Sequence, residues 1–246
     1  MLNPSILIVE NDHDTPSGVI GLQLSQLAAK VRTVNIIQRE ESVADSELAD
    51  YDGLVVLGGP MGAFDDDCYP KLVEVVRLIK HFHFSAKPIL AVCLGAQLLA
   101  RSLGSGIRPN KGGEWGFTPL KITREGRNDE VLSGMPESII LYQFHQDSIR
   151  LPADACLLMT SEECANQAFR VGALSWGFQF HPEIDTGIVA KWAELHAQDH
   201  PNDLDRLTCL KSGMQEHLPA SMDFAKTITS RWLSTVRRQS MKDQRA

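Results

Sequence analysis

Three segments of the 246-residue sequence place reactive side chains directly after short apolar runs. In the first, Cys93 follows Ile89–Val92 and precedes a helical pattern, which predicts a tight strand-to-helix turn with the thiol at its apex. The positive end of the helix dipole there favours the thiolate, the nucleophilic form of cysteine. Cys93 is therefore a candidate nucleophile, although the same position also suits a cysteine that only packs in the core.

The second segment, Trp176–Glu183, ends in His181-Pro182-Glu183. A thiol nucleophile needs a base that takes and returns protons, and the base needs an acceptor that fixes its orientation. In an extended chain, residues i and i+2 point to the same side, so the Glu183 carboxylate can contact the His181 ring. A single histidine at a strand end is more often structural, but with the cysteine turn it predicts a catalytic pair.

The third segment, Leu57–Pro60, places two glycines after another apolar run. Backbone N–H groups aimed at a carbonyl under attack stabilise the oxyanion, and glycine lets the backbone approach a ligand closely. We expect the N–H groups of Gly59 and Leu94, the residue after the nucleophile, to form an oxyanion hole. The segment lacks the lysine and the Ser/Thr of a phosphate-binding loop, so it does not predict nucleotide binding.

Alternating strands and helices must position these segments. The first half has apolar runs separated by helical patterns, as in βαβ units around a parallel sheet: 6–9, 31–37, 54–57 and 89–92, with a helix over 72–82. Later runs follow one another without helices and predict antiparallel extensions of the same sheet: 118–122, 139–142, 156–159, 168–171 and 174–180. Helical patterns then cover 186–196, 203–217 and 220–236, with Pro201 and Pro219 as expected boundaries. The expected fold is α/β, a doubly wound, flavodoxin-like mixed sheet with an antiparallel extension and C-terminal helices.

Composition narrows the function further. The chain has 24 Lys+Arg against 31 Asp+Glu, a net charge of −7, which does not favour binding to nucleic acid. Its most apolar stretch, Pro88–Ala100, is too short to span a membrane, and the N-terminus lacks the basic start of a secretory signal, so a cytoplasmic location is expected. The five cysteines show no C-x-x-C spacing, which argues against a disulfide framework or a zinc ribbon. No metal site and no cofactor is predicted.

Together the three motifs resemble the class I (triad) glutamine amidotransferases, from Ile6 to about Glu183. The sequence is most similar to stand-alone members related to the amidotransferase domain of GMP synthetase. The resemblance implies that Cys93 attacks the side-chain amide of glutamine, forms a γ-glutamyl thioester and releases ammonia. It implies that His181 is the general base and acid and that Glu183 orients it. The family-like domain is expected over residues 1–190, with a helical C-terminal appendage over 191–246.

The same resemblance assigns residues to substrate binding. Gln97 matches the glutamine of the family's G-x-C-x-G-x-Q turn, and His145, Gln146 and Asp147 match a stretch that lines the glutamine pocket. Gln146 stands where the family commonly has glycine, as does Ala91 in the turn before Cys93. A loop over 111–116 also resembles a family loop near the pocket, and its Glu114 is either structural or in contact with the substrate.

Several alternatives stay open from the sequence. No synthetase half follows residue 183, so the ammonia would pass to a separate synthetase subunit, or the same triad would hydrolyse γ-glutamyl peptides or amides directly. A homo-oligomer is equally compatible with the sequence. Ile6–Asp12 also looks like the start of a response-regulator receiver, but the third strand ends in glycines instead of a phosphorylatable aspartate. Glu10 invites comparison with another class of cysteine-turn enzymes, and an inactive binding relative is the remaining alternative.

Overall fold

The computed structural model describes residues 3–39 and 41–244, without the side chains of residues 110–112. Within these residues a nine-stranded mixed sheet has the order β2-β1-β3-β4-β9-β8-β7-β5-β6. Its strands are β1 (Ser5–Glu10), β2 (Lys30–Asn35), β3 (Gly53–Val56), β4 (Ile89–Val92), β5 (Ile107–Ile122), β6 (Ser138–Ile149), β7 (Ala155–Thr160), β8 (Ala168–Val171) and β9 (Ser175–Phe178). The helices are α1 (Gly18–Gln26), α2 (Leu72–Phe84), α3 (Leu94–Ser102), α4 (Arg124–Arg127), α5 (Thr186–Asp199), α6 (Leu204–Lys211) and α7 (Met214–Asp243), with a 3₁₀ helix η1 (Asp45–Asp50). The predicted doubly wound α/β fold with an antiparallel extension is confirmed.

The last predicted strand differs from the expectation in one respect. β9 pairs antiparallel with β8 but parallel with β4. In the parallel pair, Val92 of β4 lies opposite Phe178 of β9. The β5–β8 strands form the antiparallel part, and the chain returns from them to the parallel part of the sheet through β9. Because the carboxyl ends of parallel strands meet at one edge, the residues after β4 and after β9 become neighbours.

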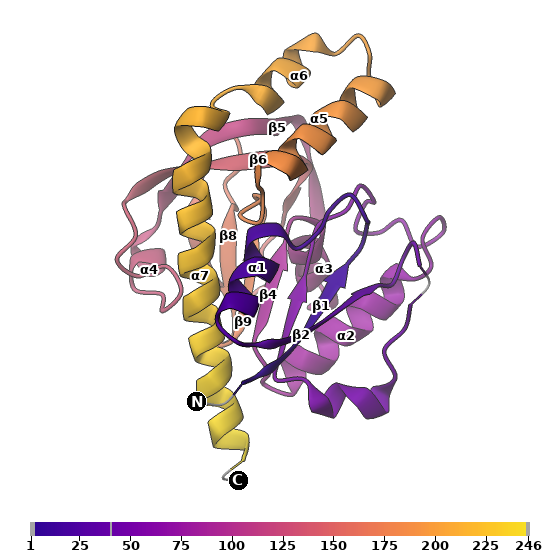
Figure 1. The fold of residues 1–246 in the computed structure, drawn as a ribbon, viewed down its shortest axis with the longest axis vertical. Coiled ribbons are helices and arrows are strands. Elements are labelled where there is room, and N and C mark those ends of the chain that lie inside the picture. The colour runs from indigo at the N-terminus through magenta and orange to yellow at the C-terminus, as the bar shows by residue number, and fades with distance from the viewer. Residues whose placement is uncertain (1–2, 40, 245–246) are drawn as a thin grey trace.

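The sheet is buried on both faces, as its continuously apolar central strands predict. Alternate residues of β1 enter different clusters: Leu7 and Val9 pack with α2 and α3, and Ile6 and Ile8 pack with α1 and α7. Figure 1 shows α7 running the length of the molecule beside α1, with α5 and α6 at one end. In the part of the chain that the structure describes, no helix has a stretch both long and apolar enough to cross a membrane.

The predicted helix boundary at Pro219 is wrong. The break between α6 and α7 lies at Gly213, whose φ of 72° is left-handed and favours glycine, and α7 continues through Pro219 in its second turn. In the second turn the missing N–H of Pro219 removes one internal hydrogen bond, and the packing of α7 on the sheet outweighs this loss. Trp232, fully buried, packs from α7 against the start of β3 at Gly53. Residue 190, the expected domain boundary, falls inside α5, and the division there stays a prediction.

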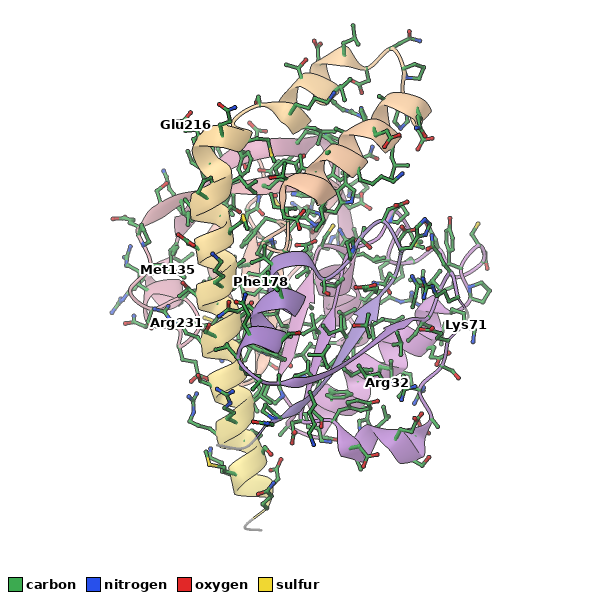
Figure 2. All side chains as sticks on the ribbon, in the orientation of Figure 1. Arg32, Lys71, Met135, Phe178, Glu216 and Arg231 are labelled. Carbon is green, nitrogen blue, oxygen red and sulfur yellow. The ribbon has the colours of Figure 1, made fainter. Side chains whose placement is uncertain are left out.

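Two further contacts fix the C-terminal helices. Arg231 of α7 donates to the main-chain oxygens of Val131 and Ser133, beside the loop that holds Met135 (Figure 2). At the other end, α6 approaches β5 so closely that a Cβ on Gly116 would lie 2.2 Å from the Cys209 oxygen. A third apolar cluster joins α5 and α6 to β6. These contacts place α5 and α6 over the same end of the sheet as the ends of β4 and β9.

Candidate active site

Cys93 lies at the junction of β4 and α3 in a backbone conformation that is rare for a residue with a side chain. Its φ is 49° and its ψ is −110°, a strained turn of the kind that clusters at functional sites. The Cys93 N–H donates to the Phe178 oxygen at 2.7 Å, and its carbonyl accepts from Gln97 N–H in the first turn of α3. The turn also needs Gly95, because a Cβ there would lie 2.2 Å from the Val56 oxygen. The predicted strand-to-helix turn is present.

His181 and Glu183 follow β9 and form a buried pair. His181 Nδ1 lies 2.7 Å from Glu183 Oε1, and the two side chains are 3% and 0% exposed. A Cβ on Gly58 would lie 3.2 Å from His181 Cε1 and 3.5 Å from Cys93 Cβ, so the ring and the thiol flank the same glycine. Within the described part of the chain, His181 Nε2 has no hydrogen-bond partner. This nitrogen is therefore free to exchange a proton with a reacting group.

The charge environment of His181 favours its protonated form. Burial by itself lowers the pKa of His181, since a charged ring loses its hydration. The negative charges of Glu183 and Cys93, with the hydrogen bond between Nδ1 and Glu183, outweigh burial and raise the pKa above its ordinary value. The arrangement can hold an imidazolium between an anionic sulfur and a carboxylate, which suits proton transfer to a leaving nitrogen.

The two predicted oxyanion donors border one cavity. Gly59 and Leu94 both line it, and neither N–H donates to another group among residues 3–39 and 41–244. Leu94 is the first residue of α3, where a helix leaves its N–H groups without internal acceptors. The turn before Gly59 is fixed by Asn11, whose Nδ2 donates to the Leu57 oxygen at 2.7 Å. Both amides are therefore available to a bound carbonyl oxygen.

Two glutamines lie behind the thiol. Gln97, buried in α3, lines the cavity and donates from Nε2 to Gln179 Oε1 at 3.2 Å. Gln179 in turn donates from its own Nε2 to Cys93 Sγ at 3.7 Å. Gln179 was not among the residues predicted from the sequence. Its position two residues before His181, on the same extended segment, is the one signal that pointed to it.

The side chain of His145 is held inside the protein. Its Nδ1 donates to the Asp147 oxygen at 2.9 Å, and its Nε2 lies 3.2 Å from Glu114 Oε2. Glu114 also accepts from Ser161 Oγ and Gln167 Nε2, so its carboxylate is part of a buried network. Of the two roles left open for Glu114, the structural one fits these contacts. His145 borders the cavity, but its ring nitrogens are directed to protein partners.

Gln146 and Asp147 lie at the end of β6 and border the same cavity. Asp147 is partly buried, and this burial raises the pKa of its carboxyl, opposed by the neighbouring His145. The nine predicted site residues therefore border or directly support one cavity of about 560 Å³. Their roles in catalysis and binding stay predictions.

Helix α5 forms one wall of the cavity, and this wall was not predicted from the sequence. Trp192 meets the His181 ring edge to face at 4.7 Å and stacks on Phe144 at 5.3 Å between ring centroids. Its indole N–H donates to the Asp14 oxygen at 2.5 Å. Nothing in the local pattern around residue 192 marks it, because its contacts come from segments distant in sequence.

One group of described residues has ligand atoms close enough for a metal ion, namely Asp12, His13 and Asp14. Gln38 already contacts two of them, since its Nε2 donates to Asp12 Oδ2 and its Oε1 lies 2.5 Å from His13 Nδ1. The His13 side chain is 64% exposed and also lies 3.3 Å from Asp14. These contacts account for the cluster without an ion.

Comparison with known proteins places this geometry in a family. The model for class I glutamine amidotransferases matches residues 13–189. The GMP synthase [glutamine-hydrolyzing] of Thermotoga maritima is 31% identical over 167 residues, which are 67% of this chain and 31% of the synthase. Gamma-glutamyl peptidase 3 of Arabidopsis thaliana is 33% identical over 151 residues, 59% of each chain. A glutamine amidotransferase structure from Methylobacillus flagellatus superposes with a TM-score of 0.84 at 23% identity, covering 95% of both chains. The chain thus spans about a third of the length of the synthase it matches.

Proposed function

The chain belongs to the class I glutamine amidotransferases, and from that premise we propose that it hydrolyses a γ-glutamyl amide, glutamine first among them, through a thioester on Cys93. The observation that supports this most directly is the strained Cys93 turn beside the buried His181–Glu183 pair, at the floor of the cavity. The spacing and burial of these groups suit acyl transfer from an amide to a thiol.

In the first half of the reaction, the Cys93 sulfur adds to the γ-carbonyl carbon, and the carbonyl oxygen becomes an oxyanion. The amides of Gly59 and Leu94 stabilise that oxyanion, and each such donor contributes about 3 kcal/mol in known cases. His181 Nε2 then gives its proton to the amide nitrogen, the C–N bond breaks, and ammonia leaves. Glu183 keeps the ring in place through Nδ1.

In the second half, water replaces ammonia beside His181. Its Nε2 takes a proton from the water while the oxygen attacks the thioester carbon, the C–S bond breaks, and glutamate is released. No step needs a metal or an organic cofactor, because the chain supplies the nucleophile, the base and the oxyanion donors.

Ammonia made in this way suits transfer to a second protein. The matched synthase is about three times longer than the region that this chain shares with it. A separate synthetase that receives the ammonia is therefore the partner we propose, with its acceptor left unassigned. The match to a γ-glutamyl peptidase favours a second candidate, direct hydrolysis of a larger γ-glutamyl compound with the same triad.

The test is ammonia release from L-glutamine by the purified chain, with Cys93→Ser and Cys68→Ser compared in parallel. Cys68 is exposed and lies outside the cavity, so it controls for loss of a thiol elsewhere. We expect Cys93→Ser to lower the rate at least about a thousandfold and Cys68→Ser to keep it. An electrophilic glutamine analogue should add mass to the peptide that holds Cys93. Equal activity of the two variants, or labelling at another cysteine, contradicts the proposed mechanism.

A further inference from the structure

The cavity extends beyond the groups that the proposed reaction uses. Its outer wall comes from the last two turns of α5, where Leu195, His196, Asp199 and His200 border it together with Trp192. The family model ends at residue 189, so this wall lies outside the matched region. The wall is fixed in place, because the indole N–H of Trp192 donates to the main-chain oxygen of Asp14 and its ring stacks on Phe144. The outer cavity thus involves residues beyond the end of the family-model match.

The volume of the cavity exceeds what glutamine needs. Glutamine is a small ligand, whereas pockets that bury drug-sized ligands measure about 300–1,000 Å³. The cavity measures about 560 Å³. Cys93 and the α5 residues Asp199 and His200 border the same cavity, so a γ-glutamyl amide held at Cys93 has room for a larger group on its scissile nitrogen.

Carboxylates predominate among the charged side chains that border the cavity. Asp12, Asp14, Asp147 and Asp199 border the cavity, and among the described residues no lysine or arginine does. The Asp12 carboxylate already accepts from Asp14 N–H and Gln38, whereas Asp199 is exposed at the rim. A carboxylate-rich pocket with low exposure favours a cation and disfavours an anion.

Two independent features of the outer cavity also point to a nitrogen ligand. His196 is 6% exposed, and its buried Nε2 has no hydrogen-bond partner in the described part of the chain; Asp203 is 3.9 Å away. Burial lowers the pKa of His196, so its ring is neutral and able to accept a hydrogen bond. Trp192 and Phe144 offer aromatic surface to a cation, whereas the Trp115 ring already faces the guanidinium of Arg206 at 4.5 Å.

We infer that the outer cavity is a subsite for the amine half of a γ-glutamyl amide, and that this amine bears a second, positively charged nitrogen. The inference rests on the proposed hydrolysis and names its substrate class: γ-glutamyl derivatives of diamines. The bonds change as they do with glutamine. The thioester forms on Cys93, the C–N bond breaks, His181 protonates the departing nitrogen, and water then releases glutamate.

The experiment compares the γ-glutamyl amides of 1,4-diaminobutane, pentylamine and 4-aminobutanoate, which have similar lengths and end in a cation, a methyl group and an anion. We expect kcat/KM for the cationic amide to exceed that for the neutral one by about tenfold, and the anionic amide to be the poorest. Asp199→Asn should reduce the ratio of kcat/KM for the cationic amide to kcat/KM for the neutral amide. Asp205→Asn removes the same charge from an exposed site on α6 outside the cavity and should leave this ratio as it is.

Binding of the same three amides to Cys93→Ala, measured by calorimetry, separates this inference from the proposed function. If the wild-type chain hydrolyses neither L-glutamine nor any of the three amides, the hydrolysis proposal fails, and the order of binding still tests the subsite. If hydrolysis depends on Cys93 but the neutral or anionic amide is bound and turned over at least as well as the cationic one, the proposed function stands and the cationic subsite is refuted. The same refutation follows if Asp199→Asn and Asp205→Asn behave alike.

Discussion

The close contact between α3 and β3 leads us to expect that a side chain at Gly95 would displace the active-site turn. A Cβ added to Gly95 would lie 2.2 Å from the Val56 oxygen, 2.8 Å from its carbonyl carbon and 3.1 Å from the Leu57 oxygen. All three atoms belong to the main chain at the end of a central, fully buried strand, so no side chain can rotate away. The start of α3 has to retreat from β3 in Gly95→Ala.

The size of the effect follows from this distance. Ordinary contact requires a retreat of about 1 Å, and overpacking of this kind costs about 1–3 kcal/mol in unfolding free energy. The same shift moves Cys93 and the Leu94 amide away from the cavity position that they share with His181. A misplacement of about 1 Å can lower a catalytic rate about a hundredfold. We therefore expect Gly95→Ala to lose more activity than its loss of stability explains.

Urea unfolding followed by tryptophan fluorescence measures the effect on stability, and glutamate release from the best γ-glutamyl substrate measures the effect on activity. Gly106→Ala is the matched control, because its Cβ would meet only Arg150 Cδ at 3.7 Å and its φ is not left-handed. The control should keep both stability and activity. If Gly95→Ala unfolds at the same urea concentration as the control and is equally active, the close approach of α3 to β3 is refuted.

Two more predictions concern buried charges. Glu183→Gln removes a negative charge that raises the pKa of His181, so this pKa falls. The alkaline limb of the pH profile of kcat/KM should move to lower pH, and kcat should drop about 10²–10⁴-fold. A profile that keeps its alkaline limb contradicts the assigned pairing. Asp129 accepts from Arg170 Nε and from the buried Trp176 Nε1, so Asp129→Ala should cost about 2–4 kcal/mol of unfolding free energy. Asp129→Asn should lose less unfolding free energy than Asp129→Ala in the same urea titration. An equal loss in the two variants would count against the hydrogen bond to Trp176.

The raised pKa of His181 also makes the stability of the fold depend on pH. In the folded chain the pKa of His181 is raised, so its contribution to stability is complete below the ordinary pKa of about 6.5. It is lost as the pH rises through the raised value. The wild-type chain should therefore lose part of its unfolding free energy on the alkaline side, and Glu183→Gln should lose less there.

The sequence predicts the parts of this molecule that depend on local pattern. Cys93, the His181–Glu183 pair and Gly59 each follow a strand whose apolar run is plain, and parallel strands bring their carboxyl ends together. The order of strands beyond β4 was less accessible, because nothing in the run at 174–180 tells whether it pairs parallel or antiparallel. The boundary at Pro219 failed because the packing of α7 on the sheet outweighs one lost hydrogen bond.

Contacts between segments that are distant in the sequence could not be predicted. Gln179 reaches the thiol only because β9 lies beside β4, and Glu114 meets His145 only through the pairing of β5 with β6. Trp192 is an ordinary helical residue until the third apolar cluster places it against His181. Such contacts depend on how the sheet and helices assemble, which a motif does not encode.

The two sides of the cavity are therefore built differently, and this bears on how the chain could acquire a new substrate. The reacting side is fixed by main-chain contacts at the sheet edge, where Gly58 and Gly95 leave no room for a side chain without displacing the Cys93 turn or crowding His181. On the α5 side, Trp192 packs in the core with Ile188 and Val189, whereas the last residues of the wall do not belong to that cluster. Asp199 and His200 can change without disturbing that packing, because both are exposed. Substrate preference can thus be altered from α5 while the proposed chemistry at Cys93 stays intact.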